Sequence, residues 1–270
     1  MSRDCPRTWI VSPSPSDAGP TVSPVLERDY LRRGAAEFVG TFALIFVGCA
    51  AAGFARSLTD VALAHGLVIA VFVSALGFIS GGHFNPAVTL GFLITRRIAP
   101  TLAVFYWVIQ MGAAVLAALL LNWVLPNAVA TASNLGSPSL GAGVSGGAGV
   151  VIEAVLTFFL VFVVFATAVD PRGAYAQISG LAIGFTIALD IFMGGLLTGA
   201  AMNPARAFGP MLVSDTWNNW WVWYIGPLAG GVIAAALYEL LYLRPGKLIE
   251  PVGPPETGVD EPRAGDAALS

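Results

Sequence analysis

The apolar residues of this chain are gathered into six long runs. Each run is long enough to cross a lipid bilayer as an α-helix, which takes roughly 20 residues. Hydrophobic residues make up 56% of the chain and charged residues only 11%, whereas a soluble domain carries about 25% charged residues. The sequence therefore predicts an all-α membrane protein with six transmembrane helices, at about 34–55, 61–80, 99–124, 149–169, 175–196 and 218–242.

The two halves of the chain are related by an internal duplication. The pattern Glu37-x-x-x-Thr41-Phe42 recurs as Glu153-x-x-x-Thr157-Phe158. Each copy contains three spans, and an odd number of spans forces the second copy to insert upside down, which makes an inverted repeat of about 31–124 and 149–242. A second set of matches keeps one constant interval: Gly66, Ala70, Gly81, Asn85, Pro86, Ala87 and Gly91 recur as Gly184, Ala188, Gly199, Asn203, Pro204, Ala205 and Gly209.

Each copy contains one Asn-Pro-Ala box, Asn85-Pro86-Ala87 and Asn203-Pro204-Ala205, followed by a short apolar stretch. Asn is a strong N-cap and Pro is favoured at the first helical position, so the boxes predict half-length helices at about 85–95 and 203–213. In an inverted repeat these half-helices enter from opposite faces and meet near the middle. A helix that starts at membrane depth must be buried in protein or line a watery cavity. The boxes therefore indicate a permeation site.

From about Leu31 to Tyr242 the chain resembles the aquaporin, or major intrinsic protein, family, for which paired Asn-Pro-Ala boxes are highly specific. The resemblance implies an aquaporin-like fold with six transmembrane helices, two half-helices and one pore in each subunit of a homotetramer. It also implies a passive channel for water that excludes protons and ions and that also passes ammonia or other small neutral solutes. We expect each box Asn to cap its helix with the side-chain oxygen and to point its NH2 group into the pore.

Arg206 is the single residue that most strongly indicates a functional role. It lies one turn into the second half-helix, and its repeat partner is Val88, so the duplication does not require it. A charge at membrane depth is a functional hypothesis by default, whereas the alternative is an arginine that snorkels to the interface. By resemblance, Arg206 is the arginine of a narrow outer filter.

The resemblance places the other filter positions at His65, Ile191 and Ala200. Typical strict water channels have Phe and His where this chain has His65 and Ile191, and the filter of glycerol channels looks more like Trp, Gly, Phe and Arg. The set found here is similar to plant vacuolar (tonoplast-type) aquaporins, which pass water and often ammonia, urea or peroxide. We expect His65 to supply a hydrogen-bond donor and Ile191 an apolar wall; the alternative for His65 is a histidine buried for packing.

Two acids, Glu37 and Glu153, occupy matching positions in the repeats. Unpaired carboxylates at membrane depth would be costly. The resemblance implies that each one binds the loop ahead of a half-helix; a proton relay is the alternative.

Other residues are assigned lesser roles. Asp190 is expected to make a hydrogen bond between helices, Cys49 to pack, and His83 to line the cytoplasmic mouth of the pore. Small residues predict close helix packing at Gly66 with Ala70, Gly184 with Ala188, Gly112 with Ala113, and Gly226 with Gly230.

Several other classes of function lack their sequence signals. The chain has only two histidines, no Gly-rich phosphate loop and no nucleophile elbow, so we expect no enzyme, no metal and no cofactor, and a net charge of −3 does not point to nucleic acid. Glycerol channels usually have Asp at the position of Ala207. They usually have a Pro with an aliphatic residue at the position of Trp223-Tyr224. A glycerol or urea facilitator remains the alternative within the family. A secondary transporter would need an ion-coupling cluster, and a junction protein would have a closed pore.

Arginines and lysines set the expected orientation. Most of them fall on one side of the predicted layout and only Arg56 on the other, so both termini are predicted to be cytoplasmic. The segments 1–30 and 244–270 are rich in Pro and polar residues and are predicted to be disordered tails of a channel domain at 31–243. No signal peptide is visible. We expect a multi-pass protein of the cell (plasma) membrane.

Overall fold

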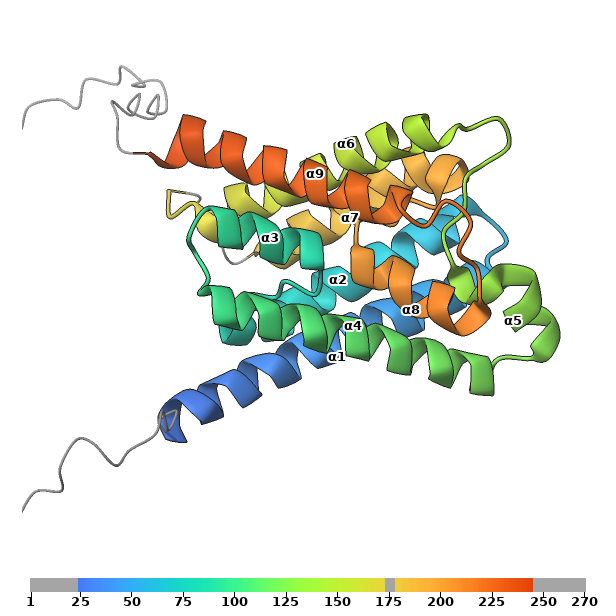
Figure 1. Ribbon diagram of the computed structural model, residues 1–270, viewed down its shortest axis with the longest axis horizontal. Helices are drawn as coiled ribbons and strands as arrows, with labels where there is room; N and C mark the ends of the chain where they lie inside the picture. The colour runs from blue at the N-terminus through green and yellow to red at the C-terminus, as the bar shows by residue number, and fades with distance from the viewer. Residues whose placement is uncertain (1–23, 173–177, 245–270) are drawn as a thin grey trace, which may run out of the picture.

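The computed structural model describes residues 24–172 and 178–244, and the regular elements in these ranges are all helices (Figure 1). Six of the helices are long and apolar enough to span a membrane. The α-helices are α1 (Pro24–Phe54), α2 (Leu58–Ser80), α3 (Pro86–Ile94), α4 (Pro100–Val124), α5 (Asn127–Ser133), α6 (Gly146–Val164), α7 (Ser179–Thr198), α8 (Pro204–Ser214) and α9 (Val222–Tyr238).

The predicted layout of spans and half-helices is present. The half-helices α3 and α8 approach each other end to end near the middle of the bundle (Figure 1). Helix α1 begins at Pro24, inside the segment assigned to the N-terminal tail, while most of both predicted tails lies outside the described residues. The connection between the repeats holds a short helix, α5, that the sequence did not predict.

Glycines allow the long helices to pack at close range. A Cβ placed on Gly66 of α2 would lie 2.7 Å from the carbonyl oxygen of Gly184 on α7, so neither helix tolerates a side chain there. Gly226 and Gly230 bring α9 still closer to α6, since a Cβ on Gly226 would lie 2.6 Å from the Glu153 Cβ and one on Gly230 would overlap the Ala154 carbonyl oxygen. For the pair Gly112 with Ala113 of α4, Ala113 is fully buried, whereas no described residue outside the adjoining backbone comes within 4 Å of a Cβ at Gly112, so only Ala113 packs closely within this chain.

Short irregular turns end two of the spans. Helix α6 continues into a π-helical turn at Phe165–Val169, and α9 continues into another at Glu239–Leu243. A 3-10 turn at Asn134–Gly136 follows α5. The last of these turns reaches the site described next.

Candidate functional site

The site begins where the two half-helices start. The Asn85 side-chain oxygen accepts a hydrogen bond from the Ala87 amide at 2.8 Å, and the Asn203 oxygen accepts from the amides of Ala205 at 3.0 Å and Arg206 at 3.2 Å. Both capping interactions that the sequence predicts are therefore present. A proline follows each Asn at the first helical position, where its missing N–H costs nothing.

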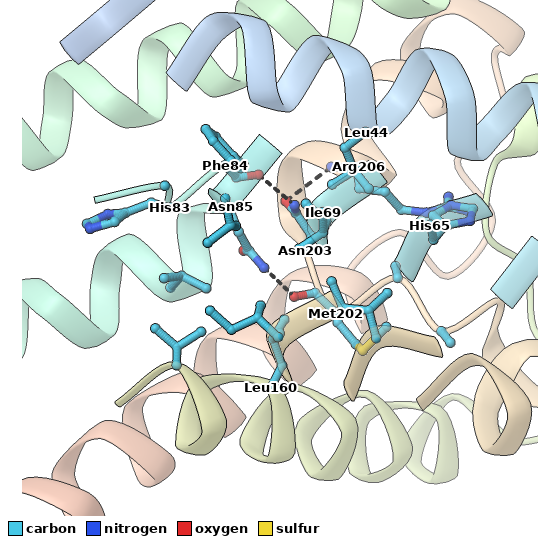
Figure 2. Close-up of a pocket in the computed structure, with 18 residues that line it drawn as sticks. Leu44, His65, Ile69, His83, Phe84, Asn85, Leu160, Met202, Asn203 and Arg206 are labelled. Carbon is cyan, nitrogen blue, oxygen red and sulfur yellow. Dashed lines mark hydrogen bonds between the residues drawn. The ribbon is translucent and has the colours of Figure 1, made fainter. Parts of the chain in front are cut away.

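The amide nitrogens of the two Asn side chains cross between the repeats. Asn85 Nδ2 donates to the Met202 carbonyl at 2.9 Å, and Asn203 Nδ2 donates to the Phe84 carbonyl at 2.8 Å (Figure 2). The sequence predicted NH2 groups free to face the pore, whereas one hydrogen of each is already used. Each NH2 group has two hydrogens, so one per Asn remains for a permeating molecule.

Two buried carboxylates hold the loops that present these carbonyls. Glu37 accepts hydrogen bonds from the backbone amides of His83 and Phe84, at 2.9 and 2.7 Å. Glu153 accepts from the amides of Ala201 and Met202, at 2.9 and 2.7 Å. Glu37 also accepts a hydrogen bond from the Ser80 hydroxyl and Glu153 one from the Thr198 hydroxyl, both at 2.7 Å. Glu37 accepts one more from the side-chain amide of Gln110. The loop-binding role that the resemblance implies is thus visible in both repeats.

A narrow cavity of about 40 Å³ runs past the Asn pair. In Figure 2, His83 lies toward one end of it, Arg206 and His65 toward the other, and the Asn pair between them. The rest of its wall is largely aliphatic: Leu44, Ile69, Val73, Val88, Leu160, Val164, Ile183 and Ile187. An apolar wall with one row of polar groups suits the passage of small polar molecules in single file.

The four predicted filter residues gather where this cavity meets a wider vestibule of about 510 Å³. His65 and Ala200 line the narrow cavity, Ile191 lines the vestibule, and Arg206 borders both. Arg206 therefore marks the junction of the narrow and wide parts.

The Arg206 guanidinium is held by backbone rather than by an acid. Its side chain is buried, and Nη1 donates to the Gly136 carbonyl at 2.7 Å. Among the described residues, Arg206 Nε has no hydrogen-bond partner and no carboxylate forms an ion pair with this arginine. A positive charge without an ion-pair partner therefore lies where the narrow cavity meets the vestibule, which opposes the entry of cations.

The Gly136 carbonyl is aimed by three consecutive left-handed residues, Asn134, Leu135 and Gly136, with φ of 47°, 54° and 75°. Cys49 closes the other side, since a Cβ on Gly136 would lie 2.7 Å from the Cys49 Cβ. Only glycine fits there. Sequence reasoning missed Gly136, although Asn-x-Gly followed by Ser-Pro is a turn signal in an otherwise charge-free connection.

His65 differs from the prediction. Its Nδ1 lies 2.9 Å from the Val61 carbonyl, and because a carbonyl can only accept, the neutral ring carries its hydrogen on Nδ1. Nε2 is then an acceptor, and it has no partner among the residues described. His65 therefore lines the pore without supplying the expected donor.

Comparison with known proteins agrees with this geometry. A family model described as "Major intrinsic protein" matches residues 25–238. The chain belongs to the major intrinsic protein family. It is therefore a transmembrane channel and not an enzyme.

Similar proteins in the family include plant aquaporins. The chain is 41% identical to "Aquaporin TIP1-2" of Zea mays, covering 80% of this chain and 87% of the relative. It is 44% identical to "Aquaporin TIP4-4" of the same plant, covering 78% and 86%. It also matches an aquaglyceroporin structure from Plasmodium falciparum with a TM-score of 0.67 and 24% identity, covering 78% of this chain and 96% of that one. This structural likeness shows the fold alone.

Three further polar or aromatic residues are buried near or between the helices of this channel. His83 lines the cavity, with Nδ1 3.0 Å from the Thr89 hydroxyl. Trp223 is fully buried and donates from Nε1 to the Thr198 carbonyl at 2.9 Å, ahead of the second box. Asp190 is buried, but its Oδ2 lacks the predicted hydrogen bond to any residue that the structure describes.

The channel end opposite the vestibule is fastened by ion pairs. Arg172 donates to Asp170 at 2.5 Å, and this hydrogen bond holds the pKa of the Asp170 carboxyl well below its usual range. Arg172 also donates to the Tyr242 carbonyl at 2.8 Å. Arg97 pairs with Glu239 at 2.7 Å. These contacts tie one connection from each repeat to the π-helical turn that follows α9.

Proposed function

We propose that this protein is a passive water channel whose pore also admits ammonia or other small neutral solutes. The observation that carries the proposal is the reciprocal Asn85–Met202 and Asn203–Phe84 pairing at the meeting point of two half-helices. It leaves two amide hydrogens facing a narrow, mostly apolar cavity. A water molecule gains hydrogen bonds there that the aliphatic part of the wall does not offer.

The same geometry opposes protons and cations. The N-terminus of a helix carries about half of an elementary positive charge, and α3 and α8 direct two of these ends toward one point. A water whose oxygen accepts from Asn85 and Asn203 turns its own hydrogens outward, which interrupts a proton wire. Arg206 adds a full positive charge at the outer end of the cavity.

The filter residues argue for a range of small neutral solutes. His65, Ile191, Ala200 and Arg206 combine a positive donor, an aliphatic wall and an imidazole whose N–H is already bonded to the backbone. A filter with few free donors discriminates weakly between water and similarly small neutral molecules. A glycerol or urea facilitator is the second candidate, but the TIP-type relatives favour a water channel over it.

The topology that we propose places both termini in the cytoplasm. Tyr30 near the start of α1 contacts Thr101 at the start of α4, and Arg97 and Arg172 both bind the π-helical turn that follows α9. The arginine-rich ends therefore lie together, and basic residues favour the cytoplasmic side. The TIP-type relatives point to an internal, vacuole-like membrane rather than the plasma membrane that the sequence alone suggested. Imaging of a fluorescent fusion beside markers of both membranes decides between them.

Flux measurements on proteoliposomes test the proposal. Stopped-flow light scattering under a sucrose gradient reports water, glycerol and urea gradients report solutes, and an internal pH dye reports ammonia. We expect fast shrinkage under sucrose, slow entry of glycerol and measurable ammonia flux. Fast glycerol entry with weak water flux would favour the facilitator instead. The expected homotetramer is checked separately by native mass spectrometry of the detergent-solubilised protein.

A further inference from the structure

The tip of the His65 imidazole rests against a glycine of another helix. Gly48 lies in α1, and a Cβ built on it would stand 2.5 Å from His65 Nε2, 2.6 Å from Cδ2 and 2.8 Å from Cε1. Carbon atoms of real side chains do not approach other atoms this closely. The missing side chain of Gly48 therefore creates a recess in α1, and the ring of His65 fills it.

No polar contact holds the ring tip in this recess. The hydrogen bond of His65 is made by Nδ1 at the base of the ring, to Val61 on its own helix. Nε2 at the tip has no partner among the described residues. The position of the tip is thus set by shape, and the shape is set by Gly48.

The recess lies directly behind the wall of the pore. Leu44, one turn before Gly48 on α1, lines the narrow cavity, and so does His65. Figure 2 shows His65 and Arg206 toward the same end of this cavity. An imidazole that leaves the recess has the cavity as the open space beside it.

The second repeat provides an internal comparison. Aligned through Glu37 and Glu153, the residue that corresponds to Gly48 is Val164; aligned through Gly66 and Gly184, the residue that corresponds to His65 is Ile183. Both of these line the cavity as ordinary aliphatic side chains. The repeat with the larger ring has the glycine, and the repeat with the smaller side chain does not.

We propose that Gly48 is a positioning residue that determines solute specificity by keeping the His65 ring drawn back into α1. This inference rests on the proposed function of the same pore. In Gly48→Ala, the new methyl group collides with three atoms that all belong to the end of one side chain and not to backbone. The ring therefore yields before the helices do, and it moves toward Arg206 and narrows the filter.

The flux test compares Gly48→Ala with Gly112→Ala. Gly112 lies within a membrane helix like Gly48 but has nothing within 4 Å of its Cβ position, so it reports the cost of a Gly→Ala change as such. We expect Gly48→Ala to lower the flux of conducted neutral solutes about tenfold relative to wild type, which corresponds to about 1.4 kcal/mol on the permeation barrier. Water flux falls less, and Gly112→Ala conducts like wild type.

Two further measurements separate the inference from the proposed function. In a His65→Ala background, adding Gly48→Ala should have no further effect, because the colliding ring is gone; an undiminished effect there would overturn the inference. Nuclear magnetic resonance of 15N-labelled histidine reads the ring directly, since the chain has only two histidines. Gly48→Ala should shift the His65 ring signals and spare those of His83. Unshifted His65 signals overturn the inference whether or not the protein conducts water, whereas absent water flux in wild type refutes the proposed function.

Discussion

Replacing Glu153 with Gln tests how strongly the loop ahead of the second box depends on its buried acid. Glu153 accepts three hydrogen bonds: Oε1 takes those of Thr198 and Ala201, and Oε2 takes that of Met202. Backbone N–H groups reach both oxygens, so both atoms must be acceptors. Gln keeps one acceptor oxygen and replaces the other with an NH2 group that can only donate.

The magnitude follows from counting what is left unpaired. If the Gln oxygen faces Ala201, the buried Met202 N–H loses its partner; if it faces Met202, the Ala201 N–H does, while the Thr198 hydroxyl can turn and accept. Either orientation orphans one buried backbone N–H, which costs about 1–3 kcal/mol. The Met202 carbonyl also holds Asn85, so the loosened loop should lower water flux as well.

The stability of the purified protein in detergent is measured by thermal or denaturant unfolding. Water flux of the same variant is measured in proteoliposomes. Glu239→Gln is the matched control, since it makes the same substitution in a partly exposed pair with Arg97, where about 0–1 kcal/mol is expected. A Glu153→Gln protein as stable as wild type, or no less stable than Glu239→Gln, would show that the loop does not depend on the carboxylate.

Three other substitutions test separate parts of the channel. Arg206→Ala removes the Gly136 contact and the filter charge, so larger solutes and some cations should pass; an unchanged solute profile would contradict its filter role. His65→Phe should restrict the pore toward water alone, and undiminished ammonia flux would count against this. Asp170→Asn should cost about 1 kcal/mol near neutral pH. The pKa of Asp170 is lower in the folded protein than the value of about 3.9 in the unfolded chain. The stability that the Asp170 carboxylate contributes is therefore fully present above about pH 3.9 and is lost as the pH falls through the native pKa. The unfolding midpoints of wild type and variant should converge in acid.

The fold was largely predictable because its signals are local and duplicated. Span length, the helix-starting chemistry of Asn85-Pro86 and Asn203-Pro204, and the repeat interval each depend on residues close in sequence. The matching acids Glu37 and Glu153 were assigned to their loops by resemblance, and the structure shows the hydrogen bonds.

The fine geometry of the pore was not predictable, since it depends on contacts between distant segments. The side-chain amide of Asn85 donates to the Met202 carbonyl, and the Arg206 guanidinium donates to the Gly136 carbonyl. Both acceptors are backbone atoms, so the residue types of Met202 and Gly136 do not indicate these contacts. The donor expected from His65 fails because Val61 on the same helix takes the hydrogen. Asp190 was expected to have a partner on a neighbouring helix, and the described residues supply none to its Oδ2.

We propose that the Asn pair and Arg206 together let water pass while blocking protons. Water and proton permeability measured on the same proteoliposomes, with the membrane potential clamped and an internal pH dye present, test it most directly. We expect water flux far above that of protein-free liposomes and proton flux equal to theirs. Proton flux that rises with the amount of incorporated protein, or water flux no faster than bare lipid, would contradict it.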